Sequence, residues 1–329
     1  MFGEELRKYL KPEPALVDLV AQVTQHPDRP RPIRAVDQIF MLPGSQLVQA
    51  LLAIDYLKYR DVVFVGDGDC MALVIAHLTN KEVFKGPGKI RVFDFDERIL
   101  AFIKQAIQDL DIPEDLISVY RYNVRDPVPK EFYQAHEVFY TNPPYGSADN
   151  GECGKLFLAR CMEFCKPAPS WGMALLPFAH KEDWSKNAMV NIQNFLCDNG
   201  YVVSEMIREI HQYHLEDRPS LRSCNMVVDR VQNQPNPFEG KRFTATDFCN
   251  FYGRRNMQIP HHIDLEGNLV MDDGKIILAG DCPKWRDSHK SKINLRDEPT
   301  GVAHVVPPVD AGSKSTPSLS KSRTKVTHK

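Results

Sequence analysis

The sequence predicts an α/β fold with a doubly wound, mostly parallel sheet and helices on both faces. Short apolar, β-branched runs such as residues 61–65 alternate with helical patterns, as expected for strands that are buried on both faces of a parallel sheet. The first run leads through a glycine-containing turn straight into a helix. Polar loops follow each of the first four strands, and the carboxyl ends of parallel strands line one crevice.

Composition narrows the class of protein. The chain has 329 residues, of which 43% are hydrophobic, and a formal net charge of -2, so it can bury a core and has no global attraction to nucleic acid. It has no apolar run of about 18 residues and no secretory signal pattern, so we expect no membrane span. Its 8 cysteines form no CxxC pair. We expect a cytoplasmic protein with free thiols and no metal site.

Four segments are expected along the chain. Residues 1–34 form a short helical arm broken by prolines, residues 35–230 the main domain, and residues 231–287 a partly ordered extension. Residues 288–329 are polar and end in a basic stretch, which cannot bury enough apolar surface to order itself. This disordered tail either stays solvated or contacts nucleic acid weakly.

Acids and glycines gather at the start of the main domain. Asp37 and Gln38 precede a helical pattern over residues 47–57, so they either cap a helix or form a wall of the site. After the strand at 61–65 the turn reads Gly66-Asp67-Gly68-Asp69. Glycines let a ligand approach the backbone closely. The two acids would repel a pyrophosphate and suit a cationic ligand instead, such as a sulfonium or an amine.

The second and third strands end in candidate nucleoside contacts. Asp94 follows the strand at 89–93, in the position that binds ribose hydroxyls in such sheets, while Asp96 is the N-cap of the next helix. The strand at 116–120 leads to Asn123 and Asp126. These two side chains either accept from an adenine amino group or belong to an Asp-Pro turn.

The fourth strand, at 138–140, stops at Asn142-Pro143-Pro144-Tyr145, because proline lacks the N–H that the ladder needs. The Asn142 side chain and the Pro143 carbonyl would accept hydrogen bonds from an amine and orient its lone pair. Tyr145 would stack on the amine or cover it. The alternative is a plain proline-rich turn.

The remaining elements complete the sheet. Residues 146–154 are expected to be a mobile lid before a helix at 155–164. A fifth strand covers 172–177, a helix runs from about 180 to 197, and the strands at 201–210 and 223–229 form an antiparallel pair. Glu216 and Asp217 lie between those two strands, where they either face a polyamine or form a solvated loop.

Five motifs in this order resemble the branched-chain polyamine synthase family, the N4-bis(aminopropyl)spermidine synthases. The resemblance covers about residues 33–230. It implies a Rossmann-like fold of the class I methyltransferase type, and transfer of an aminopropyl group from decarboxylated S-adenosylmethionine to a secondary amine of spermidine. The motifs are Asp37-Gln38, Gly66-Asp67-Gly68-Asp69 and the stretches 92–98, 124–129 and 141–145.

The chain departs from the family pattern at three positions. The family has an aspartate at Gly68 and at Asn142, and tends to have one at Asn123. Its N-terminal winged-helix domain is mostly missing here. An aspartate before Pro-Pro can take a proton from an ammonium, whereas Asn142 only orients a neutral amine. Asn-Pro-Pro-Tyr is also the motif of amino-methyltransferases that modify adenine, cytosine or glutamine.

We therefore expect an alkyltransferase that acts by in-line displacement at the sulfonium carbon, with positioning as the main source of catalysis. The first interpretation is aminopropyl transfer to a polyamine such as spermidine, without a metal. The alternatives are an S-adenosylmethionine-dependent amino-methyltransferase acting on a base or a protein amide, and a non-catalytic nucleoside-binding homologue. A homodimer is compatible with this account. The predicted catalytic residues are Asn142, Pro143 and Tyr145; the predicted cofactor-binding residues are Gly66, Asp67, Gly68, Asp69, Asp94, Asn123 and Asp126.

Overall fold

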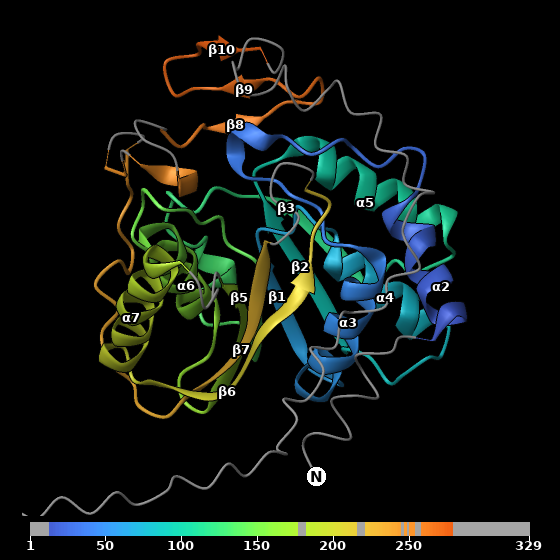
Figure 1. Cartoon of the computed structure of the whole chain (residues 1–329), viewed down its shortest axis with the longest axis horizontal. Coiled ribbons are helices and arrows are strands. Elements are labelled where there is room, and N and C mark those ends of the chain that lie inside the picture. The colour runs from blue at the N-terminus through green and yellow to red at the C-terminus, as the bar shows by residue number, and fades with distance from the viewer. Residues whose placement is uncertain are drawn as a thin grey trace, which may run out of the picture. The chain divides into compact units, whose positions relative to one another are not determined.

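A seven-stranded sheet forms the centre of the protein (Figure 1). The computed structural model describes residues 13–176, 182–215, 221–244, 247–248, 250–253 and 258–278. The strand order is β3-β2-β1-β4-β5-β7-β6. The strands are β1 (Asp61–Val65), β2 (Lys89–Asp94), β3 (Ile117–Arg121), β4 (Val138–Thr141), β5 (Ser170–Leu176), β6 (Tyr201–Gln212) and β7 (Arg222–Arg230).

The first five strands pair in parallel, and β7 is antiparallel to both β5 and β6. This arrangement confirms the predicted fold class and the predicted antiparallel pair. The order reverses at β1, whose neighbours are β2 and β4. The carboxyl ends of β1, β2 and β4 therefore meet at one edge, at the switch point where open α/β sheets bind ligands.

Helices cover both faces of the sheet. On one face, α3 (Pro43–Leu57), α4 (Met71–Asn80) and α5 (Glu97–Asp109) cover the sheet in the core that contains Val62 and Phe64, and α2 (Pro14–Thr24) packs on α3 and α4. On the other face, α6 (Glu152–Phe164) and α7 (Asp183–Asp198) pack over Val63 and Val65 (Figure 1). Alternate residues of one strand thus enter two separate cores, which explains why β1 is apolar from Val62 to Val65.

Two helices begin earlier than expected. The helix α3 starts at Pro43, because proline supplies the fixed φ of a first helical position and its missing N–H costs nothing there. The helix α6 starts at Glu152, so the predicted lid at 146–154 is too long. Asp149 is buried and accepts from the backbone N–H groups of Gly151 and Cys153, which holds this loop against the helix.

The C-terminal extension returns over the carboxyl edge of the sheet. It contains the 3₁₀ turn η3 (Phe251–Gly253) and a small antiparallel sheet of β8 (His262–Ile263), β9 (Leu269–Val270) and β10 (Ile276–Ile277) (Figure 1). Further 3₁₀ turns are η1 (Arg34–Val36) and η2 (Lys130–Phe132). A row of ring contacts runs through Phe238, Phe243, Phe248 and Phe251, so the extension has an apolar anchor of its own.

Two expectations from the sequence, on membrane spans and on cysteines, can be compared with the described residues. Within them, no helix is both long and apolar enough to span a bilayer. The described cysteines are free thiols, and all but Cys197 are buried. Glu216, Asp217 and the tail at 288–329 lie outside the described part of the chain.

Candidate functional site

The turn after β1 requires its first glycine. Gly66 has φ of +72°, and a Cβ there would lie 2.7 Å from the ring of Phe157. Its N–H donates to the Phe93 carbonyl at 2.8 Å, which carries the strand pairing into the turn. Gly68 is under no such constraint, because a Cβ there would meet Gln38 Cγ at an ordinary 3.5 Å.

Two of the predicted acids hold the backbone of this edge together. Asp67 accepts from the N–H groups of Met71 at 2.8 Å and Ala72 at 3.0 Å, so its carboxylate caps the start of α4. Asp94 accepts from Asp67 N at 2.7 Å and from Asp96 N at 2.9 Å. Burial raises the pKa of Asp67, and it raises the pKa of Asp94 to about 6 with the help of Asp96.

Asp69 links the first turn to the Asn-Pro-Pro-Tyr loop. One carboxylate oxygen accepts from Met41 N at 2.9 Å, and the other accepts from Asn142 Nδ2 at 3.1 Å. Since the Asn142 nitrogen is directed at Asp69, its Oδ1 remains as an acceptor for a ligand. Burial raises the pKa of Asp69 to about 6, an effect that Arg29 opposes.

Tyr145 sits between two segments that come from distant parts of the sequence. Its backbone N–H donates to Asp37 Oδ2 at 3.2 Å, and its side chain hydrogen-bonds to that of Tyr213 after β6. Asp37 itself has a left-handed φ of 60° at the end of η1. It is thus not the cap of α3, whose N-cap is Leu42, and its carboxylate instead contacts the candidate loop.

Gln38 occupies the space beside Gly68. Its Nε2 donates to Asp96 Oδ2 at 2.8 Å, and its Oε1 accepts from Ile33 N at 2.8 Å. Asp96 also accepts from Arg98 N, which confirms the predicted N-cap of α5. Gln38 therefore lies where a longer side chain at position 68 would project.

The structure places Asn123 differently from the prediction. Its Nδ2 donates to the carbonyls of Pro260 and His261 at 2.7 and 2.9 Å, and its Oδ1 accepts from Arg125 N. Both ends of the amide therefore bind the chain itself, and Asn123 holds the C-terminal extension. The Asp126 carboxylate lies 3.0 Å from Arg242 Nε.

The extension instead brings Tyr252 to this edge. The rings of Tyr252 and Phe95 are nearly parallel, with centroids 6.5 Å apart. The Phe95 carbonyl accepts from Ile263 N at 3.1 Å. Tyr252 is a contact that the sequence argument missed, because no local pattern links residue 252 to the end of β2.

Arg29 is a second residue that the sequence argument missed. It comes from the N-terminal arm, and its Nη2 donates to the Asp69 carbonyl at 2.9 Å and lies 3.8 Å from the Asp69 carboxylate. Its guanidinium stacks over Phe40, 3.8 Å from the ring centroid. A single arginine between an aspartate and a proline carries no sequence signal for such a position.

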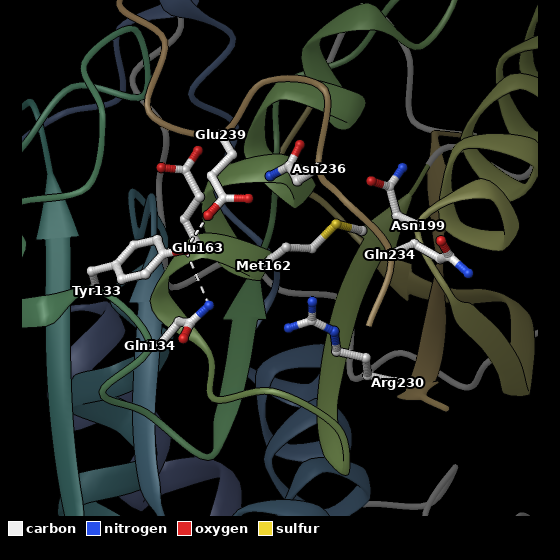
Figure 2. A pocket seen from close by; sticks show the side chains of 9 residues that line it. All are labelled: Tyr133, Gln134, Met162, Glu163, Asn199, Arg230, Gln234, Asn236 and Glu239. Carbon is white, nitrogen blue, oxygen red and sulfur yellow. Dashed lines mark hydrogen bonds between the residues drawn. The ribbon is translucent and has the colours of Figure 1, made fainter. Parts of the chain in front are cut away.

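The carboxyl edge is closed by these contacts. Asp67, Asp69 and Asp94 are 2%, 6% and 5% exposed, so little of these three acids is open to solvent. Two hollows lie at the opposite, amino edge. One, of about 10 Å³, lies among Tyr133, Glu163, Arg230 and Glu239 (Figure 2) and has room for about one water molecule. The other lies beside Arg60 and Trp171.

Comparison with known proteins gives the family. The model of the branched-chain polyamine synthase A C-terminal domain matches residues 18–246. The N(4)-bis(aminopropyl)spermidine synthase of Thermus thermophilus is 28% identical over 189 residues, which cover 56% of this chain and 50% of that one. Its namesake from Methanocaldococcus jannaschii is 31% identical over 191 residues, with the same coverage of 56% and 50%.

A solved structure agrees with the fold. The branched-chain polyamine synthase from Thermus thermophilus, in complex with N4-aminopropylspermidine and 5′-methylthioadenosine, has a TM-score of 0.58 at 22% identity, covering 69% of this chain and 66% of that one. The present chain spans about half the length of the curated relatives it matches. Because the family model covers well over half of the chain, the protein belongs to the branched-chain polyamine synthase family, in the region of the synthase A C-terminal domain.

Proposed function

We propose that the protein transfers an aminopropyl group from decarboxylated S-adenosylmethionine to a nitrogen of a polyamine such as spermidine. The observation that carries this proposal is the charge of the carboxyl edge. Five aspartates gather there, and arginines contact two of them, Arg29 at Asp69 and Arg98 at Asp96. A net negative, water-poor edge attracts cations more strongly than an exposed one. The aspartates are Asp37, Asp67, Asp69, Asp94 and Asp96.

The charge also bears on the choice of donor. S-adenosylmethionine carries a carboxylate that its decarboxylated form lacks. Beside Asp67, Asp69 and Asp94 that carboxylate would be repelled, whereas the sulfonium and the amine of the decarboxylated donor would be attracted. In this proposal Asp94 binds the ribose, and Gly66 and Gly68 admit the donor close to the backbone.

The chemistry is a displacement that depends on orientation. The acceptor nitrogen first loses its ammonium proton to solvent; its lone pair then attacks the methylene carbon next to the sulfonium, the C–S bond breaks, 5′-methylthioadenosine leaves, and the product nitrogen keeps its N–H as a tertiary ammonium. Asn142 Oδ1 and the Pro143 carbonyl accept from the N–H of the acceptor and so aim its lone pair. Asp69 supports this step, because its hydrogen bond to Asn142 Nδ2 fixes which end of the amide faces the ligand.

A direct assay tests the proposal. The protein is incubated with decarboxylated S-adenosylmethionine and spermidine, and the products are identified by mass spectrometry. We expect N4-aminopropylspermidine and 5′-methylthioadenosine in equal amounts. Asn142→Ala should abolish transfer and leave donor binding intact. No product from the natural chain would overturn the proposed reaction, whereas unchanged turnover in Asn142→Ala would overturn only the site assignment.

Asn142 itself favours a second candidate. An asparagine before Pro-Pro orients a neutral amine and removes no proton, which suits the planar amino group of a base or an amide. An S-adenosylmethionine-dependent amino-methyltransferase would therefore use the same loop. Replacing the donor by S-adenosylmethionine, and spermidine by single-stranded DNA or RNA, tests this candidate in the same assay.

A further inference from the structure

A buried chain of hydrogen bonds runs from Tyr145 into the core between β6, β7 and α3. The Tyr145 side chain bonds to Tyr213, the Tyr213 hydroxyl lies 2.6 Å from Ser223 Oγ, and Ser223 Oγ lies 2.7 Å from His211 Nδ1. His211 Nε2 in turn lies 2.7 Å from Gln49 Oε1. None of the last four residues is more than 8% exposed, so water does not compete for these bonds.

The inner end gives this chain a direction. Gln49 Nε2 lies 2.9 Å from Met173 Sδ and 3.1 Å from Asn225 Oδ1. A thioether sulfur only accepts hydrogen bonds, so the nitrogen of the Gln49 amide has to face Met173. Its oxygen therefore faces His211, which must then carry its proton on Nε2.

Each further link follows from the previous one. With a proton on Nε2 and none on Nδ1, neutral His211 accepts from the Ser223 hydroxyl. Burial lowers the pKa of His211 to about 3, which keeps the ring neutral at physiological pH. Ser223 has used its hydrogen and so accepts from Tyr213. Tyr213 donates its own hydrogen to Ser223, so its oxygen accepts from Tyr145.

We propose that this chain fixes Tyr145 as a hydrogen-bond acceptor for an N–H group of the substrate amine. The proton of Tyr145 is committed to Tyr213, so its hydroxyl oxygen can act toward a ligand only as an acceptor. Tyr145 then adds a third acceptor oxygen to Asn142 Oδ1 and the Pro143 carbonyl. Three acceptors on one loop suit a polyamine, whose neutral reacting nitrogen offers one N–H while its neighbouring ammonium groups offer further donors. Tyr213, Ser223, His211 and Gln49 are positioning residues in this scheme.

The direction can be measured without any activity. In the full chain labelled with ¹⁵N-histidine, NMR distinguishes the two neutral tautomers of His211, and the resonance is assigned by its loss in His211→Gln. We expect the proton on Nε2. A proton on Nδ1 would reverse every link and overturn the proposal.

The second measurement rests on the proposed aminopropyl transfer. Tyr213→Phe breaks the chain next to Tyr145 and removes one oxygen. We expect the KM for spermidine to rise roughly tenfold, about the worth of one hydrogen bond to a charged group, with kcat and the KM for the donor little changed. Ser223→Ala, a smaller change, should also raise the KM for spermidine.

Tyr201→Phe is the matched control. It removes a hydroxyl from another buried tyrosine, at the start of β6 beside Arg230 and far along the strand from Tyr213, and should leave the KM for spermidine unchanged. An unchanged KM in both Tyr213→Phe and Ser223→Ala would overturn the role of the chain. Absence of transfer in the natural protein would instead overturn the proposed function, and the tautomer measurement would still decide the direction of the chain.

Discussion

At the scale of single residues, the buried aspartates at the carboxyl edge mainly accept hydrogen bonds from the protein itself. Both carboxylate oxygens of Asp67 accept hydrogen bonds from backbone N–H groups at the start of α4. The two oxygens of Asp69 accept from Met41 N and Asn142 Nδ2, so in the proposed site Asp69 acts mainly through the amide that it orients. Burial makes each carboxylate expensive to ionise, which ties cation binding to pH.

The first prediction concerns this pH dependence. Asp69 and Asp94 have pKa values of about 6, raised from 3.8. Above pH 6 both are charged and attract a cation; as the pH falls below 6 they bind protons and the attraction is lost. Spermidine stays cationic throughout this range. Calorimetry should show that the affinity for spermidine falls below pH 6, by up to roughly tenfold per pH unit for each carboxylate that binds a proton.

Arg29 supplies the control for that measurement. Its guanidinium opposes the raised pKa of Asp69, so Arg29→Met should raise the pKa further and move the loss of affinity to higher pH. The variant keeps a long apolar side chain over Phe40, where the guanidinium now stacks. An affinity that does not change between pH 7.5 and 5 in the natural protein would contradict the role of these acids.

At the scale of elements, strands β4 and β5 pack closely because Gly172 of β5 has no side chain. A Cβ on Gly172 would lie 2.0 Å from Cζ of Phe139, which is its neighbour in register. The ring of Phe139 fills the space over the glycine, and this packing holds β4, the strand that leads into the Asn-Pro-Pro-Tyr loop.

Gly172→Ala should therefore destabilise the fold by about 1–3 kcal/mol, the usual cost of overpacking a core. Urea unfolding measures the change. The double variant with Phe139→Leu should recover part of the loss, because the smaller side chain makes room. Gly68→Ala is the matched control, since its Cβ meets Gln38 at an ordinary 3.5 Å. Equal stability of the two alanine variants would contradict the packing described.

The ion pair between Arg125 and Asp272 also holds the extension. Arg125 is buried and binds Asp272 through two hydrogen bonds of 2.7 Å each, and its carbonyl accepts from Phe243 N. Arg125 lowers the pKa of Asp272, so the carboxylate is charged and the link is intact at every pH above the ordinary pKa of an aspartate. It weakens as the pH falls through the lowered value.

Asp272→Ala should leave Arg125 buried without its carboxylate, an expensive arrangement, and so loosen the extension. Hydrogen exchange should become faster in β8, β9 and β10, while β1 and β4 stay protected. Glu266→Ala, in the same extension and exposed, is the control and should change little. Unchanged exchange in Asp272→Ala would show that the aromatic row alone holds the extension.

At the scale of the whole molecule, local sequence patterns were enough to predict the sheet. The strands at 61–65 and 89–93 were predicted within a residue of their ends, because a buried parallel strand is marked by its own composition. The convergence of Asp69 and Asn142 followed from topology, since both come after parallel strands next to each other in the order.

The parts that were missed depend on contacts between distant segments. Arg29 reaches Asp69 across 40 positions, and Asn123 meets His261 across 138. No pattern near Asn123 marks its amide as occupied by the extension. His211 and Gln49 are likewise paired across 162 positions, and each on its own looks like an ordinary residue of a strand or a helix.

The central claim is that an acidic edge selects a decarboxylated sulfonium donor. Isothermal titration of the full chain with S-adenosylmethionine and, separately, with its decarboxylated form tests this most directly, because the two ligands differ by one carboxylate. We predict clear preference for the decarboxylated form. Preference for S-adenosylmethionine would contradict aminopropyl transfer and favour methylation, and binding of neither donor would favour a non-catalytic protein.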